Sequence, residues 1–546
     1  MLVLRQVDAP GETGRMELSL IIELNRGASV PMHRQLYEQM RAAILNGTVR
    51  SHTRVPASRQ LAQALEISRT TVTQSYDQLI SEGYLLTRPG AGTFVCAHIP
   101  EALLNADTSL APAQTTDVPE TANADVATFT TASNDRLSNY GLRVQHLPER
   151  THDPENTYSF RYGIPDFERF PIKTWRRLVS RHQLASTHWM GYSPDPMGYA
   201  PLREEIARYI TQVRAVQCEP EQILITHGTQ EALGLITRLL MNPGDAIAIE
   251  NPGYLSGHAV FSANGATLQP VSVDHQGIQI DGPQGLKSIA TEKTRLVYVT
   301  PSHQFPTGVL MSLSRRLALL QWAQHHNALI IEDDYDSEFR YSGRPIPALQ
   351  GLDKAGRVLY VGTFSKILFP GLQVGYVVLP PELVPVFGRA KWLCDRQCAW
   401  IDQATLADFI REGELAKHVR RMRPVYSQRR HTLITALRKI DTATSAHLEI
   451  LGDEAGLHIM TRTRPFRQTQ ERLIQQAHNR GVSLFSARPQ YRKLGDREPV
   501  NNSPYPRQPE ASASQGANEL IFGFGAIKTA AIKTAFETIQ DLWHAE

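Results

Sequence analysis

A lysine and a carboxylate near the middle of the chain are residue types that pyridoxal phosphate (PLP) chemistry requires. Lys366 ends the segment GTFSK (362–366), and Asp333 follows a hydrophobic run that ends in EDDY (332–335). A lysine amine forms a Schiff base with an aldehyde, and a carboxylate can hold a pyridine nitrogen protonated, which makes the ring an electron sink. The pair therefore predicts a PLP site with Lys366 as its catalytic, Schiff-base residue.

Other residues suit the remaining parts of the cofactor. Gly228-Thr229-Gln230 join an expected strand to a helix, whose free N–H groups and dipole favour a phosphate. Thr363 and Ser365 add hydroxyl donors. Tyr335 is expected to hydrogen-bond the phenolic oxygen of the ring, and Tyr254 to stack on its face. Each feature is common alone, so the prediction depends on their joint order along one segment.

The hydrophobic pattern predicts the sheet that must position these residues. Val/Ile-rich runs at 223–225, 246–249, 296–299, 329–331 and 358–361 are typical of buried strands. Helices are expected between several of them, including 230–241 and 314–326. Residues 157–380 are therefore expected to form an α/β large domain with a mostly parallel sheet. Ligands of such sheets gather beyond the carboxyl ends of the strands, where Asp333 and Lys366 both lie.

The rest of the chain after this domain, 381–546, is expected to form C-terminal helices and a smaller α+β domain. Helical periodicity covers 383–391, 403–426 and 428–440. Residues 488–517 are polar and rich in Pro and Ser, which predicts an exposed insertion.

The first hundred residues follow a different pattern. Apolar residues at helical spacing predict three helices, and Ser68 is a suitable N-cap for the third. The turn at 89–91 separates two short strands. Residues 17–96 are therefore expected to form a winged helix-turn-helix domain, mainly α with a β-wing. Residues 1–16 are expected to be a disordered tail, and 97–156, rich in Ala, Thr, Asp and Pro, a flexible linker.

The third helix of this domain has side chains suited to double-stranded DNA. Its first turns, which a recognition helix presents to the major groove, contain Arg69, Thr70, Thr71 and Gln74. Arginine can pair with guanine and glutamine with adenine, while threonine contacts phosphate or base edges. Arg59 is expected to meet phosphate, and Gly92 lets the wing approach the DNA backbone. A winged helix that serves only protein contacts remains the alternative.

Length and composition set outer limits. A chain of 546 residues is too long for one core, and its net charge of +3 requires no particular partner. Four scattered cysteines complete no zinc pattern, so no metal site is predicted, and they suit a reducing compartment. No run approaches the roughly 20 apolar residues of a membrane span. A cytoplasmic protein without membrane contact is expected.

Several motifs resemble known families. PASRQLA (56–62), SRTTV (68–72), GYL (83–85) and GAGTFV (90–95) closely resemble the GntR family of bacterial regulators. Residues from 158 to about 525 resemble fold-type I aminotransferases. More narrowly, TPSHQFPTG (300–308), EDDYDSEF (332–339) and GTFSK (362–366) look like the MocR subgroup, which fuses a winged helix to an aminotransferase-like domain.

This resemblance implies how the residues and partners are used. It implies operator binding by a dimer through the recognition helix and the wing. It also implies Lys366 as the Schiff-base lysine, Asp333 as the partner of the pyridinium and Tyr335 near the phenolic oxygen. The implied homodimer is head-to-tail, with cofactor sites at the subunit interface, where Tyr192 or its neighbours reach the partner's phosphate.

Two positions depart from the family pattern. Most relatives carry an arginine after FPGL (369–372) that pairs with the cofactor phosphate, and this chain has Gln373. Losing a contact of ~1.5–3 kcal/mol weakens PLP binding roughly tenfold or more, unless another cation substitutes. Residues 520–525 also lack the arginine that enzymes use to clamp a substrate carboxylate, which leaves Arg462 or Arg464 as substitutes. Efficient transamination is therefore not expected.

The leading hypothesis is a PLP-dependent, DNA-binding transcriptional regulator. Its effector would be PLP itself or a small amino compound, sensed at Lys366, and would change operator binding. A catalytically active aminotransferase with an accessory DNA-binding domain is the alternative. A regulator whose cofactor site has decayed is the third reading, and a residual transaminase half-reaction stays open.

Overall fold

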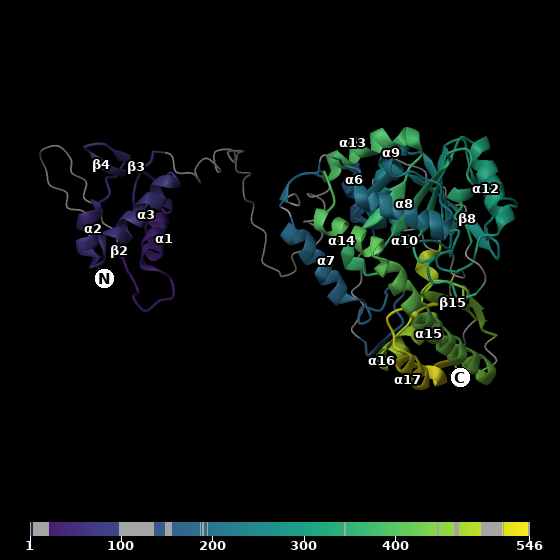
Figure 1. The fold of residues 1–546 in the computed structure, drawn as a ribbon. Helices are drawn as coiled ribbons and strands as arrows, with labels where there is room; N and C mark the ends of the chain where they lie inside the picture. Colours follow the sequence, from purple (N-terminus) through teal and green to yellow (C-terminus); the bar gives the residue numbers. More distant parts are fainter. Residues whose placement is uncertain are drawn as a thin grey trace, which may run out of the picture. The chain divides into compact units, whose positions relative to one another are not determined.

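The computed structural model describes residues 2–3, 21–97, 136–147, 156–185, 187, 190–193, 195–342, 346–444, 447–463, 469–492, 516 and 518–543. The chain divides into two compact units, which lie within 1–124 and 125–546. Figure 1 shows the helices and strands of each unit.

The described part of the first unit contains three helices and a β-hairpin. Its elements are α1 (Met32–Leu45), α2 (Ser58–Ala64), α3 (Arg69–Ser81), β3 (Leu85–Arg88) and β4 (Gly92–Val95). Leu36, Val72 and Leu79 are fully buried where the helices meet. The Ser68 hydroxyl caps α3 by accepting a hydrogen bond from the N–H of Thr71 at 3.1 Å. This confirms the winged helix-turn-helix prediction, including the cap.

The start of the chain differs from the expected disordered tail. Strand β1 (Leu2–Val3) pairs antiparallel with β2 (Ile21–Ile22). Two apolar residues at each position can pair across a short ladder, and composition alone gave no sign of it. The rest of the expected tail, 4–16, lies outside the described residues.

The second unit is built on an eight-stranded sheet of order β6-β13-β12-β11-β10-β7-β8-β9. These strands are β6 (Ile223–Thr226), β7 (Ala246–Asn251), β8 (Thr267–Asp274), β9 (Gly277–Ile278), β10 (Thr294–Val299), β11 (Leu329–Asp334), β12 (Val358–Thr363) and β13 (Gly375–Val378). All five expected strands are present, and pairing is parallel from β12 through β8. The unexpected β13 lies antiparallel between β12 and β6.

Helices cover both faces of this sheet. They are α7 (Ile172–Ala185), α8 (Ala200–Arg214), α9 (Gly228–Leu240), α10 (Leu255–Ala263), α11 (Leu286–Ile289), α12 (Leu313–His325), α13 (Val384–Cys394) and α14 (Trp400–Arg411). Alternate residues of β6 enter different cores: Leu224 packs with residues of α9, whereas Ile223 and Ile225 pack with residues of α8. A strand buried on both faces explains the continuous apolar runs in the sequence.

The smaller α+β domain carries a four-stranded sheet of order β14-β15-β18-β17. Its elements are β14 (Glu449–Leu451), β15 (His458–Arg462), α16 (Gln470–Asn479), β17 (Phe485–Ser486), β18 (Glu519–Gly523) and α17 (Thr529–Ile539). In addition, β5 (Tyr158–Ser159) pairs with β16 (Val482–Ser483), so the start of the range expected for the large domain, 157–380, is joined to the smaller domain.

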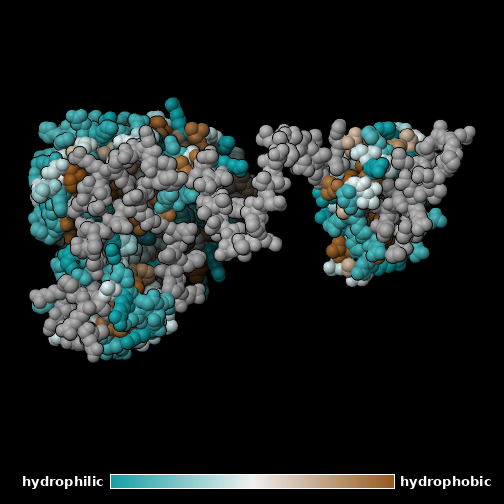
Figure 2. Space-filling model, turned by 180° about the vertical axis from the view of Figure 1, so that it is seen from behind, coloured by the Kyte–Doolittle hydropathy of each residue, from teal (hydrophilic) through white to brown (hydrophobic). Residues whose placement is uncertain are grey.

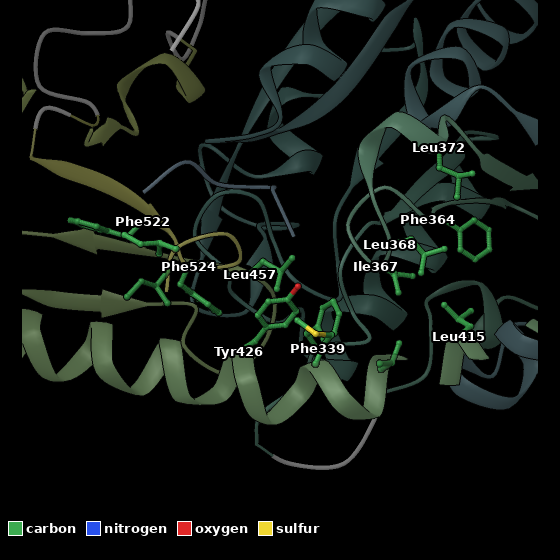
Figure 3. Close-up of a cluster of buried hydrophobic side chains, with 14 of the residues drawn as sticks. Phe339, Phe364, Ile367, Leu368, Leu372, Leu415, Tyr426, Leu457, Phe522 and Phe524 are labelled. Carbon is green, nitrogen blue, oxygen red and sulfur yellow. The ribbon is translucent and has the colours of Figure 1, made fainter. Parts of the chain in front are cut away.

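One long helix, α15 (Glu414–Thr444), leads into the smaller domain. The predicted break between 426 and 428 is wrong, because the helix continues through Pro424 and the break lies at Gly413, whose φ is +73°. Figure 3 shows why the helix holds together: Leu415 and Tyr426 lie in a buried cluster with side chains of both domains, including Phe339, Ile367 and Phe522.

Part of the expected linker, 97–156, is a helix. Residues Asn139–Gln145 form α6, with the Ser138 hydroxyl accepting from the N–H of Gly141 at 3.2 Å. Arg143 fixes it to α10 by donating from Nε to the carbonyl oxygen of Ala263 at 2.9 Å. Composition suggested a flexible chain because a seven-residue helix with few apolar residues gives almost no periodic signal. Residues 98–135 and 148–155 lie outside the described residues.

The exposed insertion expected at 488–517 does not begin at 488. Gln490 is only 4% exposed. The N–H of Arg492 donates to the side-chain oxygen of Asn251 at 2.8 Å, and the Asn251 amide donates to the Arg492 carbonyl at 2.9 Å. These polar residues are buried because they satisfy each other's hydrogen bonds. Residues 493–515 lie outside the described residues.

The described helices do not resemble membrane-spanning segments. None of them combines the length and apolar character needed to cross a bilayer. In Figure 2 the coloured part of the visible face is mostly hydrophilic, with small hydrophobic areas.

Candidate cofactor site and DNA-binding surface

The candidate cofactor site is assembled at one edge of the large sheet. Strands β11 and β12 are parallel, and β13 returns between β12 and β6. In the register, Gly375 pairs with Thr363 on one side and with Thr226 on the other. The chain segments that follow β6, β11 and β12 therefore leave the sheet at the same edge, as the sequence predicted for Asp333 and Lys366.

Lys366 lies in the loop after β12 and points into the domain. Its Nζ donates to the carbonyl oxygen of Gly163 at 2.9 Å. A Cβ atom at Gly163 would lie 3.0 Å from that nitrogen, and the φ of +73° also favours glycine. The loop is anchored by Phe364 and Leu368, each 1% exposed. The core therefore fixes the lysine backbone while the amine stays half-buried.

Asp333 is a buried carboxylate in which the described part of the protein gives a hydrogen bond to only one of the two oxygens. Its Oδ2 accepts a hydrogen bond from the Tyr298 hydroxyl at 2.7 Å, whereas Oδ1 is buried and has no hydrogen-bond partner among the described residues. Burial raises the pKa of Asp333 to about 7, against the opposing effects of Tyr298 and of the Lys366 charge. A buried acceptor without a donor fits a pyridinium N–H. The residues present thus fit PLP.

The two predicted aromatic residues lie on neighbouring loops. The Tyr335 hydroxyl donates to the carbonyl oxygen of His303 at 2.8 Å, and burial raises its pKa well above the usual range, so it is a neutral donor. Tyr254 precedes α10, and its hydroxyl accepts from Gln230 Nε2 at 3.2 Å. Its ring meets Phe305 edge-on, at 5.9 Å between centroids.

The N-terminus of α9 carries the residues that the sequence predicted as a phosphate cradle. Gly228 opens the helix with φ +73°, and Thr229 follows it, half-buried. A Cβ at Gly375 would lie 2.9 Å from the Cα of Gly228, so this close approach requires glycine. The hydroxyls of Thr363 and Ser365 lie 3.0 Å apart at the same edge.

Gln373 lies beside this cradle without replacing the missing charge. A Cβ at Gly228 would lie 3.9 Å from Gln373 Oε1, and the side-chain amide donates to the Pro370 carbonyl at 2.8 Å. A buried cation close to the first turn of α9 is Lys391, whose Nζ lies 2.7 Å from Glu231 and 2.6 Å from Asp395. Two carboxylates neutralise this lysine, so it is a poor substitute for the arginine.

The structure adds cofactor-site residues that sequence reasoning missed. Tyr298 donates a hydrogen bond to Asp333. Gly163 and Gly375 leave room for neighbouring atoms that a Cβ would exclude. His303 lies between Tyr335 and Asp336. None follows a recognisable spacing, because each is brought to the site by the pairing of strands distant in sequence.

The predicted DNA-contacting residues share one surface of the first unit. Arg69, Thr70 and Gln74 are exposed on α3, and Arg59 is exposed on α2. Thr71 is half-buried, and its hydroxyl lies 2.9 Å from that of Ser68, so it stabilises the start of the helix.

Two arginines that the sequence prediction left out lie at the wing: Arg54, from the segment before α2 that bridges to Phe94, and Arg88 of β3. A Cβ at Gly92 would lie 2.7 Å from Arg54 Nε, and the Gly92 φ is +115°. On the same hairpin, the Arg88 guanidinium lies 5.2 Å from the centre of the Phe94 ring. Both guanidinium groups add positive charge to the wing, which favours contact with phosphate.

Comparison with known proteins agrees with both sites. Residues 159–489 match the family described as Aminotransferase class I and II, and residues 32–95 match Bacterial regulatory proteins, gntR family. A kynurenine aminotransferase from Pyrococcus horikoshii, solved in complex with PMP, superimposes with a TM-score of 0.64. It is 25% identical in sequence, and the match covers 76% of this chain and 98% of that one.

Regulators also match the chain, two of them over a larger share of it than the aminotransferase. The probable rhizopine catabolism regulatory protein MocR of Rhizobium meliloti is 39% identical, over 85% of this chain and 88% of its own. The uncharacterised regulator YhdI of Bacillus subtilis is 32% identical, over 95% and 97%. The pyridoxine biosynthesis regulator PdxR of Corynebacterium glutamicum is 31% identical, over 76% and 81%. With a GntR domain ahead of a class I and II aminotransferase domain, the chain belongs to the MocR subgroup of the GntR regulators.

Proposed function

We propose that this protein is a transcriptional regulator that senses PLP, or a small amino compound through PLP, and changes its binding to operator DNA accordingly. The observation that carries the proposal is the buried, unsatisfied Oδ1 of Asp333. It stands at the sheet edge that also holds Lys366, in a chain whose first unit is a DNA-binding domain. A regulator that binds chromosomal DNA acts in the cytoplasm, where we place it.

Each part of the site has a role toward PLP. Lys366 would hold the aldehyde carbon as a Schiff base, and Asp333 would accept a hydrogen bond from the N–H of the pyridinium ring. The N–H groups at Gly228 and Thr229, with the hydroxyls of Thr363 and Ser365, would bind the phosphate. Tyr335 and Tyr254 would fix the phenolic oxygen and the ring face. When bound, PLP supplies an electrophilic carbon that reacts with amines.

Transamination is less well supported than sensing. The described candidate for a substrate clamp, Arg462, is held by Glu519 at 2.7 Å and by Glu449 at 3.1 Å. An arginine already paired with two carboxylates would have to exchange them for substrate, which weakens the orientation of a substrate acid. The second candidate, Arg464, lies outside the described residues.

A head-to-tail homodimer completes the proposal. Tyr192 is 73% exposed and Leu393 85% exposed, and Arg396 lies 5.1 Å from the rings of both Tyr192 and Trp392. An exposed aromatic and aliphatic patch of this kind is typical of a protein interface. On a partner, Tyr192 would reach the cofactor phosphate, as the family resemblance implies.

The cofactor part is tested by titrating the purified full chain with PLP and following near-visible absorbance. We expect saturable binding, and borohydride reduction should fix one PLP on Lys366, as read by peptide mass. Lys366→Ala should abolish both signals. A wild-type protein that stays colourless and retains no PLP after reduction would disprove the sensor.

The DNA part uses sequences selected by the full chain from a random duplex pool. Arg69→Ala should weaken binding to the selected duplex in gel shifts without changing PLP absorbance, because the two sites lie in separate units. Arg34→Ala, on α1, is the control. For Lys366→Ala we expect basal DNA binding to persist and the response to PLP to disappear. An unchanged response would count against coupling.

A further inference from the structure

One cavity of the second unit is lined by none of the residues assigned to the cofactor. It measures about 410 Å³ and opens between α8, the first half of α15 and the loop after β11. We propose that it binds a small organic anion, one that carries a carboxylate or phosphate on an apolar body, as a second ligand of the regulator.

Arginines give the cavity its charge. Arg420 and Arg423 lie one turn apart on α15, and Arg340 enters from the loop after β11. Within the described part of the chain, no carboxylate forms an ion pair with Arg420 or Arg423, and Arg423 donates only to the Glu338 carbonyl, at 3.0 Å. Two guanidinium groups without counter-ions on one helix face suit a carboxylate or phosphate, which accept paired hydrogen bonds.

Arg340 supplies a buried donor as well. Its Nη2 lies 3.2 Å from Glu454, but its Nε is buried and meets no hydrogen-bond partner in the part of the chain that the structure describes. A buried N–H without an acceptor costs free energy, so an incoming oxygen atom would be stabilised there. The side chain is 16% exposed, which fits a donor at the wall of a cavity and not a solvated surface charge.

The remaining walls are apolar. The apolar lining comes from Val213 of α8, from Val419 of α15 and from Leu310, which precedes α12. Its volume lies in the range of small-molecule sites, which combine apolar walls with a few polar groups that fix orientation. An inorganic anion would leave these walls uncovered, so the ligand class is an anion with an organic body.

One acidic group faces the arginines. The Glu338 carboxyl accepts a hydrogen bond from the Tyr209 hydroxyl at 3.1 Å, and burial raises its pKa to about 7. Near neutral pH a large fraction of this acid is therefore protonated. The cavity keeps a positive balance, which an anion can enter.

Arg214 connects the cavity to residues next to the cofactor site. Successive side chains at the end of β11 point to opposite faces: Asp333 meets Tyr298, whereas Asp334 meets Arg214 at 2.7 Å. Arg214 lines the cavity and also hydrogen-bonds Ser302, the neighbour of His303. A ligand that moves Arg214 would therefore act on residues adjacent to Asp333 and His303, which gives a physical route for modulation of PLP binding.

The test uses phenyl phosphate, a dianion with an apolar ring, and isothermal titration calorimetry on the full chain. We expect binding by the wild type and equally by Lys366→Ala, because the site is separate from the cofactor lysine. Arg420→Ala/Arg423→Ala should weaken binding at least tenfold, and Arg420→Lys/Arg423→Lys should recover part of it. Arg438→Ala, exposed on the same helix, is the matched control.

Several outcomes would overturn the inference. Wild-type affinity in the double alanine variant would place the ligand elsewhere, and loss of binding in Lys366→Ala alone would place it in the cofactor site. Inorganic phosphate that binds as tightly as phenyl phosphate would contradict the organic body, while benzoate separates carboxylate from phosphate recognition. These measurements do not depend on PLP or DNA binding, so they can fail while the proposed function stands.

Discussion

At the scale of single residues, the cofactor site depends on a carboxylate that destabilises the protein without PLP. Asp333 has an unfolded pKa of about 3.9, and burial raises its folded pKa to about 7. The folded chain therefore holds the proton more tightly, so this group's contribution to stability is fully present below pH ~4 and is lost as pH rises through ~7. The protein keeps Asp333 buried in spite of this loss of stability, and a role of Asp333 in binding a ligand accounts for it.

Asp333→Asn should separate stability from binding. The variant cannot ionise, so we expect PLP-free protein to melt higher than wild type at pH 8, with at most ~4 kcal/mol gained, and to gain less, at most ~1.5 kcal/mol, at pH 5. PLP affinity, read by absorbance, should fall at least tenfold. The difference between variant and wild-type melting temperatures at the two pH values is the measurement. An equal difference in melting temperature at pH 5 and at pH 8 would contradict the raised pKa of Asp333.

Gln373 offers a gain-of-function test at the phosphate cradle. The residue has φ +51°, and its side chain lies beside Gly228. Gln373→Arg keeps the same backbone strain and adds the charge that relatives place there. We expect PLP affinity to rise about tenfold, as a charge-assisted contact would give. Gln373→Met, a similar volume without charge, is the control and should not gain affinity.

Residue types and spacing predicted Lys366 and Asp333 as site residues, but they did not predict the residues that contact them. The lysine follows a strand and the acid ends another, so both positions can be derived along the chain. Tyr298 and Gly163 are distant in sequence and act only through the fold, Tyr298 by one hydrogen bond and Gly163 by leaving room for an amine. A single sequence carries no record of such contacts.

At the scale of elements, buried strands were predicted well and helix ends poorly. Five apolar runs became five strands because burial on both faces leaves a continuous signal. Strand β13, only four residues long, carries no such signal, and its antiparallel placement is a property of the sheet. The break in α15 was misplaced because Pro424 normally ends a helix. Here Met422 and Tyr426, both fully buried, hold the helix on either side of it.

The docked helix α6 gives a prediction at this scale. Its link to α10 is the Arg143 hydrogen bond to Ala263, and α10 begins directly after Tyr254 of the cofactor site. Arg143→Ala should release α6, because one charged hydrogen bond contributes about 1.5–3 kcal/mol. We expect hydrogen exchange in 139–145 to accelerate about tenfold by mass spectrometry.

Arg136→Ala serves as the control for that experiment, since Arg136 is exposed on the same segment. Its exchange rates over 139–145 should match the wild type. Unchanged exchange in Arg143→Ala would mean that α6 is held by other contacts.

At the scale of the whole molecule, the proposed function requires the two units to act together in a dimer. A single winged helix makes a small interface with DNA, and its affinity comes largely from phosphate contacts. A dimer of the larger units would tether two winged helices, so that binding of one raises the effective concentration of the other to about millimolar. The cofactor domain would then control DNA binding by setting how the two arms are presented.

The exposed patch around Leu393 is where this pairing can be broken. Leu393→Asp places a charge on a side chain that is 85% exposed in one chain. If the patch is buried between subunits, the carboxylate loses its hydration on pairing, and light scattering should report monomers at micromolar concentration. Affinity for a selected operator should then fall about a hundredfold, and the dependence of log affinity on log salt should drop to about half, because one arm contacts half the phosphates.

Leu313→Asp, on α12, changes an exposed leucine of 61% exposure in the same way and should leave the dimer intact. A dimeric Leu393→Asp with unchanged salt dependence would move the interface elsewhere, and would remove the support that this patch gives to Tyr192 as a residue of the partner's cofactor site.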